Sequence, residues 1–179
     1  FAPMMDGVGL DGMGPDDSSG FAFTEPEPEE LPSRLELNGL EYVRINTAEL
    51  LTKETMVGLE QGDRYVFQGE VVRTPEMDRV GYIAVNRMLI VCCFADALGV
   101  AVLVRVDDPE AYEQGSWVRA AGSMHSDPMG LETYEVPNAG MFAALTSASF
   151  FLLAEQVQTE SPPEWLFIFE VREQEPFAY

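Results

Sequence analysis

The sequence predicts a mainly β domain, a small closed or half-closed barrel of five to six strands with one N-terminal helix and an inserted loop region. Strand-length segments rich in β-branched and aromatic residues follow one another at short spacing. One early segment carries helix signals, and glycines mark bends along the strand segments. Short strands in such a series are typical of small barrels.

The first ordered elements are expected from residue 35 onward. Leu40–Ile45 has the pattern of a short strand. Asn46 can then cap a helix, because Glu49 follows at the spacing of a capping box. Apolar residues spaced along Thr47–Glu60 predict the helix itself, which we expect to end before Gly62.

Strand patterns fill most of the rest of the chain. Arg64–Arg73 contains Gly69, which we expect at a bulge or tight bend. A turn at Pro75 leads to Tyr82–Cys93, which is apolar on both faces, as in a central strand. The remaining predicted strands are Gly99–Val106, Trp117–Met124, Phe150–Val157 and Trp165–Val171. We therefore expect a small OB-like barrel.

The chain divides into two expected parts. Residues 1–34 are predicted to be an acidic flexible leader or linker, because they are rich in Gly and Pro and their acids are not balanced by cations. Residues 35–179 are predicted to form a single barrel-like domain. Within it, residues 125–149 mix Pro, Gly and Asn and are expected to be an insertion between strands.

The charge balance narrows the possible partners. The chain has 10 Lys+Arg against 31 Asp+Glu, a formal net charge of -21. A field of that sign repels phosphate backbones and anionic lipid headgroups, so we expect no binding to nucleic acid. Cations, cationic ligands and basic protein surfaces remain possible partners, although acidity also serves solubility alone.

Neither a membrane span nor a catalytic signature is present in the sequence. No stretch approaches the roughly 18 apolar residues that a spanning helix needs. The chain begins at Phe1 without a signal region, so we expect any anchor to lie outside this chain. The nucleophile-elbow, zinc-protease, phosphate-loop and dinucleotide patterns are missing, which favours a binding role over an enzyme.

Cys92 and Cys93 are adjacent, so they do not form a disulfide framework. Neighbouring side chains of an extended strand point to opposite faces, so the two thiols share a pocket only if the chain bends there. Three interpretations follow. The cysteines are small buried hydrophobes, or one lines a ligand or metal pocket, or the pair is redox-active through a strained disulfide.

Asp96 follows the cysteines at the predicted strand end. Its carboxylate can cap the turn there through backbone N–H groups. Alternatively, Asp96 joins Cys92 or Cys93, with His125, to hold a metal ion. Zinc in structural sites takes four ligands, and the chain has a single His. No other cofactor is predicted.

Arg73 and Arg87 are ligand-binding candidates, because cations are scarce in this chain. Arg87 interrupts an otherwise apolar strand face, and a buried arginine must be paired. We expect Arg87 to meet Glu70 across the sheet. The alternative is that Arg87 anchors an anionic ligand.

Several short patterns carry a family resemblance. The most specific is Arg87-x-x-Ile90-x-Cys92-Cys93-x-Ala95-Asp96-Ala97, within Phe67–Val104. Supporting patterns are Arg73-x-Pro75, Trp117-Val118-Arg119 with Gly122, and the closing Glu175-Pro176-Phe177-Ala178-Tyr179. Over residues 40–179 the chain resembles the C-terminal domain of the YcgQ-like family of bacterial membrane proteins.

The resemblance implies a transmembrane region preceding this chain, a permease-type membrane partner and a β-barrel outside the bilayer. We therefore expect a non-catalytic accessory ectodomain of a membrane permease complex, at the cell membrane and on its extracellular side, that binds a protein partner or small solute. One alternative is a metal-binding or metal-sensing domain using Cys92 and Cys93 with Asp96. A second alternative is a thiol redox protein using the same pair.

Overall fold

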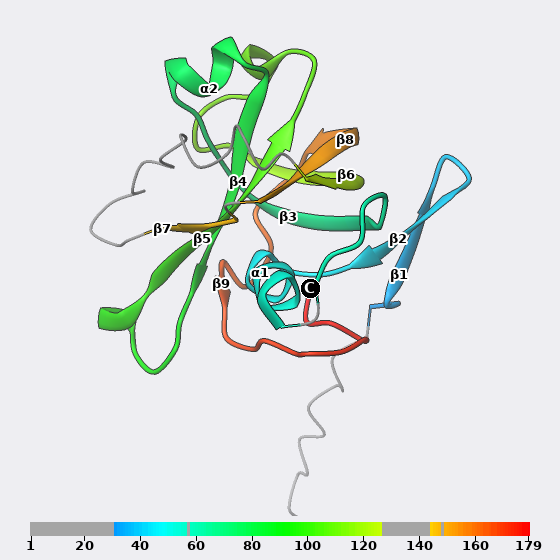
Figure 1. The fold of residues 1–179 in the computed structure, drawn as a ribbon. Helices are drawn as coiled ribbons and strands as arrows, with labels where there is room; N and C mark the ends of the chain where they lie inside the picture. The colour runs from blue at the N-terminus through cyan, green and yellow to red at the C-terminus, as the bar shows by residue number, and fades with distance from the viewer. Residues whose placement is uncertain (1–30, 57, 127–143, 148) are drawn as a thin grey trace, which may run out of the picture. The chain divides into compact units, whose positions relative to one another are not determined.

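The computed structural model describes residues 31–56, 58–126, 144–147 and 149–179, and within them five strands close into a barrel (Figure 1). These strands are β3 (Arg64–Val72), β4 (Tyr82–Leu89), β5 (Leu98–Arg105), β6 (Trp117–Ser126) and β8 (Phe150–Thr159). Around the ring the order is β3, β6, β8, β5 and β4, which returns to β3. All neighbours are antiparallel except β5 and β8, which are parallel. The predicted small OB-like barrel is confirmed.

Further elements surround this ring. They are β1 (Arg34–Leu37), β2 (Leu40–Arg44), α1 (Thr47–Met56), α2 (Pro75–Arg79), β7 (Ala144–Thr146), β9 (Phe167–Ile168) and the short 3₁₀ turns η1 (Phe94–Asp96) and η2 (Pro109–Ala111). β1 and β2 form a hairpin, and β2 runs parallel to β3. β7 runs parallel to β5, and β9 runs parallel to β4. Residues 1–30 of the expected leader and most of the expected 125–149 insertion lie outside the described residues, whereas Arg34, the last residue of the expected leader, begins β1.

Alternate apolar residues of the five strands fill the barrel. The buried members of this core on the ring strands are Tyr65, Phe67, Val71, Ile83, Val85, Val102, Val104, Val118, Ala120, Met124 and Leu152. Ile45 and Leu50 join the same core from the α1 region, so the helix packs across one end of the barrel. Full burial of each large aliphatic or aromatic side chain contributes about 1.5–3 kcal/mol.

The capping box before α1 is confirmed. Asn46 Oδ1 accepts from the Glu49 N–H at 2.9 Å, and Glu49 Oε2 accepts from the Asn46 N–H at 3.1 Å. The helix ends at Met56, whereas the sequence pattern predicted that it would continue to Glu60. Gly58 explains the earlier end, since its φ of +88° suits a helix C-cap and its N–H donates to Lys53 O at 2.9 Å.

Glu49 also holds the C-terminal segment of the chain against the barrel. Its side chain is fully buried, and its Oε1 accepts from the Arg172 N–H at 2.9 Å and from the Ala178 N–H at 2.8 Å. Burial raises the pKa of the Glu49 carboxyl, while these backbone donors favour its ionised form. One carboxylate thus links the start of α1 to residues more than 120 positions away along the chain.

The last predicted strand is much shorter in the structure, and one predicted turn is a helix. The strand expected over Trp165–Val171 pairs only at Phe167–Ile168. The turn expected at Pro75 is the short helix α2, because the side chain of Thr74 accepts from the Met77 N–H at 3.2 Å and Pro75 stands at its first position. No helix in the described part of the chain has the length and apolar character to cross a bilayer.

The prediction that the third long strand reaches Cys93 is wrong. β4 ends at Leu89, where it pairs with Leu98 as the last register pair of the β4–β5 hairpin. The Ile90 N–H then donates to Ile168 O at 2.9 Å, and the chain leaves the sheet. Residues 90–97 form the turn that leads from β4 into β5. The apolar sequence of residues 90–93 continues the pattern of β4, and for this reason these residues were predicted to belong to the strand.

Gly69 brings β3 unusually close to β4. A Cβ at this position would lie 2.6 Å from the backbone oxygen of Asn86, so only glycine fits. β3 pairs with β4 only from Glu70 onward, opposite Asn86. From Met88 onward, β4 pairs with β9 instead of β3. The register of β3 against β6 runs through Gly69 without a shift, so the predicted bulge is not found there, and Gly69 instead permits a close approach between two backbones.

Candidate functional site

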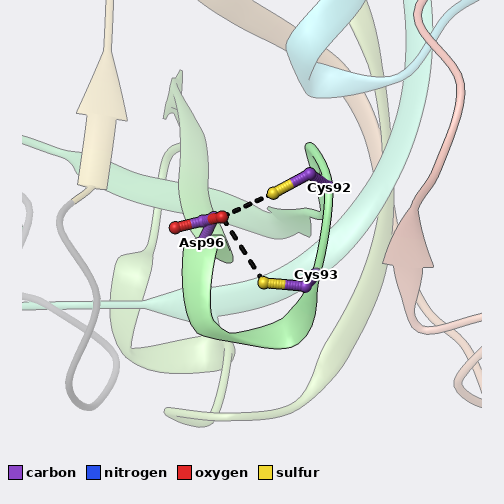
Figure 2. Close-up of side chains that lie close together, drawn as sticks. All are labelled: Cys92, Cys93 and Asp96. Atoms are coloured by element: carbon purple, nitrogen blue, oxygen red, sulfur yellow. Dashed lines mark hydrogen bonds between the residues drawn. The ribbon is translucent and has the colours of Figure 1, made fainter.

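The loop between β4 and β5 brings three potential metal ligands together. After Ile90, the chain bends through Cys92 and Cys93 into the 3₁₀ turn η1. The Asp96 N–H donates to Cys93 O at 3.0 Å, which closes the turn. As a result, the side chain of Asp96 lies over both cysteines, and the two sulfurs point toward its carboxylate (Figure 2).

The contacts within this group are short. Cys92 Sγ donates to Asp96 Oδ2 at 2.6 Å, and Cys93 Sγ donates to the same oxygen at 3.4 Å. The three ligand atoms all lie within 4.8 Å of one another, and all three residues are exposed. Among the described residues, no other group of three or more His, Cys, Asp or Glu side chains meets this spacing. We call Cys92, Cys93 and Asp96 the thiol–carboxylate cluster.

Two expectations for these residues are corrected. In a straight strand at least one cysteine would be buried, but the bend after Leu89 leaves both thiols free and exposed. Asp96 was expected to cap the turn with its carboxylate. In the part of the chain that the structure describes, its carboxylate instead accepts from the two thiols.

Hydrogen bonding shifts the pKa values within the cluster in opposite directions. The bond to Asp96 raises the pKa of the Cys92 thiol, because the carboxylate stabilises the protonated sulfur. The bonds from Cys92 and Cys93 lower the pKa of the Asp96 carboxyl for the same reason. A metal ion that binds here must therefore displace a thiol proton that the carboxylate helps to retain.

The cluster has the donor set of a site for a thiophilic metal. Thiolates favour Zn²⁺ and Cu⁺, and a carboxylate oxygen is a common additional ligand of zinc. Tetrahedral zinc with Zn–S bonds of about 2.3 Å places its sulfur ligands about 3.8 Å apart. Ligand atoms already within 4.8 Å of one another need only small side-chain rotations to reach that geometry. Three protein ligands leave one coordination position open.

The structure does not bring His125 to this cluster. Its Nε2 lies 3.1 Å from Ser123 Oγ, and its ring stacks on Phe151 with centroids 5.9 Å apart. Phe151 also packs edge-on against Tyr82, the first residue of β4. The cysteines follow the last residue of the same strand, so His125 and the cysteines belong to opposite ends of β4.

Arg73 has a structural role. Its guanidinium donates to both carboxylate oxygens of Asp78 at 2.9 Å and to Tyr112 O at 2.8 Å. The hydrogen bond to Asp78 raises the pKa of Arg73. These bonds tie α2 to the loop after β5, and they occupy the groups with which Arg73 would bind a ligand.

Arg87 is buried as predicted, with 5% of its surface exposed, but its predicted partner is wrong. Its Nη2 donates to Trp165 O at 2.7 Å, while its Nε is buried without a hydrogen-bond partner. Glu70 lies opposite Asn86 in the sheet and so faces the other side from Arg87. Burial lowers the pKa of Arg87, and no acid in the described residues forms an ion pair with it.

Sequence reasoning missed two surface features near this arginine. The first is a cavity of about 200 Å³, and its lining residues are Glu70, Asn86, Arg87, Met88, Trp117, Leu166 and Phe167. The second is a pair of exposed aromatic side chains, Trp165 and Phe169, whose rings pack edge-on and which we call the aromatic patch. Apolar residues in 165–171 were taken for strand residues, and their exposure follows only from the shortness of β9.

Comparison with known proteins identifies the family. Residues 33–137, more than half of the chain, match the family model described as DUF1980 C-terminal domain. The matched segment includes the strands β3 to β6 and the thiol–carboxylate cluster. No curated protein matches the chain. The chain therefore belongs to the DUF1980 C-terminal domain family.

Proposed function

We propose that this domain binds a thiophilic metal ion, Zn²⁺ or Cu⁺, through the sulfurs of Cys92 and Cys93 and the carboxylate of Asp96. The observation that carries the proposal is the convergence of these three ligand atoms within 4.8 Å on an exposed loop. Neither cysteine contributes to a buried core cluster, so packing does not account for their place in the loop.

Hydrogen bonds hold the loop between β4 and β5 in a defined conformation, and this favours the binding of an ion by its side chains. The β4–β5 hairpin is paired along its whole length up to Leu89 and Leu98. Backbone bonds from Ile90 to Ile168 and from Asp96 to Cys93 fix the loop at its start and near its end. A site on a rigid hairpin loses less conformational entropy when the ion binds.

A competition titration with a chromophoric chelator tests this proposal. The chain should bind one Zn²⁺ or Cu⁺ in excess Mg²⁺, which masks weak binding by the many carboxylates. Cys92→Ser and Cys93→Ser should each weaken binding at least tenfold, because each removes a thiolate ligand. Asp107→Ala is the matched control, since Asp107 is an exposed acid on the loop after β5. Binding that survives in the double cysteine variant would exclude the cluster as the site.

A second role is supported by the aromatic patch, namely docking to a membrane permease as an accessory domain. Trp165 is 66% exposed and Phe169 is 54% exposed. Trp165 and Phe169 pack edge-on with centroids 6.0 Å apart, so the exposed rings form a continuous surface. Exposed aromatic groups of this kind are typical of protein interfaces. The YcgQ-like resemblance implies a permease-type protein as the partner class and a position of the domain outside the bilayer, and both are part of this proposal.

Co-purification from membranes tests the docking role. The protein should be co-expressed with a permease-type membrane protein, and detergent extracts should be analysed for a co-purified polytopic protein. The double variant Trp165→Ser/Phe169→Ser should lose the partner, while the exposed apolar residue Val80 provides the control Val80→Ser. Equal recovery with both variants, or no polytopic partner with the unchanged chain, would rule out docking through this patch.

A further inference from the structure

The cavity of about 200 Å³ lies where β4 exchanges β3 for β9 as its neighbour in the sheet. At the end of the β3–β4 pairing Glu70 lies opposite Asn86, and two residues further along β4 Met88 lies opposite Phe167 of β9. On its other side, Glu70 lies opposite Trp117 of β6. All five of these residues line the cavity.

The strand register places these five side chains on one face of the sheet. Residues directly opposite each other on neighbouring strands share a face, and so do residues two apart on one strand. Val85 of β4 belongs to the barrel core, so Asn86 and Met88 face outward. Arg87 faces the other way, and its guanidinium donates to Trp165 O. The cavity is therefore an outward-facing site, to which Arg87 contributes its backbone.

Two hydrogen-bond acceptors on this face lack a donor. Asn86 is 3% exposed, and its Oδ1 is buried without a hydrogen-bond partner. The carboxylate of the half-buried Glu70 takes part in none of the ion pairs or hydrogen bonds found among the described residues. A buried acceptor without a donor is costly, and a carboxylate favours a donor that carries a positive charge. The two groups together therefore call for a cation with N–H donors.

The remaining walls suit an apolar body attached to that cation. Trp117, Phe167 and Met88 are all half-buried and lie on the same face as the two acceptors. The faces of aromatic rings attract cations and pack well against other rings. An apolar cavity of about 150 Å³ holds benzene, so the volume of about 200 Å³ leaves room for a benzene-sized body with a short ammonium arm.

We infer that this cavity binds a small primary ammonium ion with an apolar body, the chemistry of an arylalkylamine. The ammonium group donates to the Glu70 carboxylate and to Asn86 Oδ1, and the apolar body packs against Trp117 and Phe167. The inference uses neither the thiol–carboxylate cluster nor the aromatic patch, so it stands or falls separately from the proposed functions.

Three probes of similar size separate the effect of charge from that of apolar packing. Benzylamine is positively charged at neutral pH, benzyl alcohol is neutral and benzoate is negative. In about 150 mM NaCl, which screens the general field of the chain, calorimetry should show that benzylamine binds at least tenfold more tightly than either analogue. In Trp165→Phe, Trp117 is the remaining tryptophan of the chain, so its fluorescence should change when benzylamine binds. Failure of benzylamine to bind, or equal binding of benzyl alcohol, would overturn the inference.

Two variants test the assigned acceptors. Glu70→Gln removes the charge at a half-buried position, so it should weaken benzylamine binding at least tenfold and leave that of benzyl alcohol unchanged. Asn86→Leu replaces the unpartnered amide by an apolar group of similar size, so the thermal midpoint should not fall, while benzylamine should again bind at least tenfold more weakly.

The matched control is Glu76→Gln, which removes an exposed carboxylate of α2 and should bind benzylamine normally. Unchanged benzylamine binding by Glu70→Gln would contradict the assignment of the acceptors. An equal loss of binding in Glu76→Gln would show that the general negative charge of the chain, and not this cavity, attracts the amine.

Discussion

At the scale of single residues, Asp96 controls the protonation of Cys92. The thiol donates to the carboxylate, and this hydrogen bond is the main reason why the pKa of Cys92 is raised. Removing the acceptor should therefore lower the pKa and increase the fraction of thiolate near neutral pH. Asp96→Ala should accelerate alkylation of Cys92 by iodoacetamide severalfold at about pH 7, and it should move the midpoint of the rate–pH profile to lower pH.

The measurement needs a background in which one thiol reacts. Cys93→Ser leaves Cys92 as the remaining cysteine of the chain, so the rate reports on that sulfur alone. Asp107→Ala in the same background controls for a general loss of negative charge. A midpoint that stays in place, or that moves to higher pH, would show that Asp96 does not hold the proton on Cys92.

At the scale of elements, Glu49 joins α1 to the C-terminal segment through three backbone donors. Glu49→Ala leaves these buried or partly buried N–H groups without an acceptor, and each such loss costs about 1–3 kcal/mol when water cannot replace it. We expect the free energy of unfolding to fall by about 2–4 kcal/mol, measured by urea denaturation. The exposed Glu173→Ala is the control and should stay within about 0.5 kcal/mol of the unchanged chain. A small effect of Glu49→Ala would show that the C-terminal segment does not depend on this carboxylate.

The close approach of β3 to β4 gives a second prediction for an element. A Cβ at Gly69 would meet the Asn86 oxygen at 2.6 Å and a Val85 methyl at 2.9 Å. The backbone oxygen cannot move without breaking the pairing of the two strands, so Gly69→Ala should destabilise the fold by about 1–3 kcal/mol. The half-buried neighbour Gln68→Ala is the control. Equal thermal midpoints for the two variants would argue against the close approach.

At the scale of the whole molecule, the ring of strands could be predicted because its signal is local. The alternating valines predicted a strand over Gly99–Val106, and the β-branched residues predicted one over Arg64–Arg73. Their predicted bounds agree with those of β5 and β3 to within a residue or two. The ends of the strands were harder to predict from the sequence. The apolar pattern of β4 continues through Ile90 and Val91. These two residues lie outside the strand because the chain turns there toward β5, with the Ile90 N–H bonded to Ile168 O.

The candidate sites also divide into features with a local sequence signal and features that depend on distant segments of the chain. The sequence placed Cys92, Cys93 and Asp96 at one strand end, but their convergence depends on a bend that periodicity does not encode. Burial of Arg87 could be predicted from its apolar face, whereas its surroundings depend on β9, a two-residue strand paired about 80 positions away in the chain. Contacts between distant segments therefore decide what these residues can bind.

The net charge of -21 leads to a prediction for the whole chain. Like charges repel one another more strongly in the folded state than in the expanded unfolded state, and salt screens this repulsion. The ion pairs of the described part are mostly exposed and contribute little, so their screening should not outweigh the gain. Raising NaCl from about 20 mM to about 500 mM should increase the thermal midpoint by a few degrees at about pH 7. Near the isoelectric point of about 4.1 the increase should shrink, because the net charge approaches zero. A midpoint that falls with NaCl at neutral pH would mean that the ion pairs, and not the repulsion, dominate the electrostatic free energy of this fold.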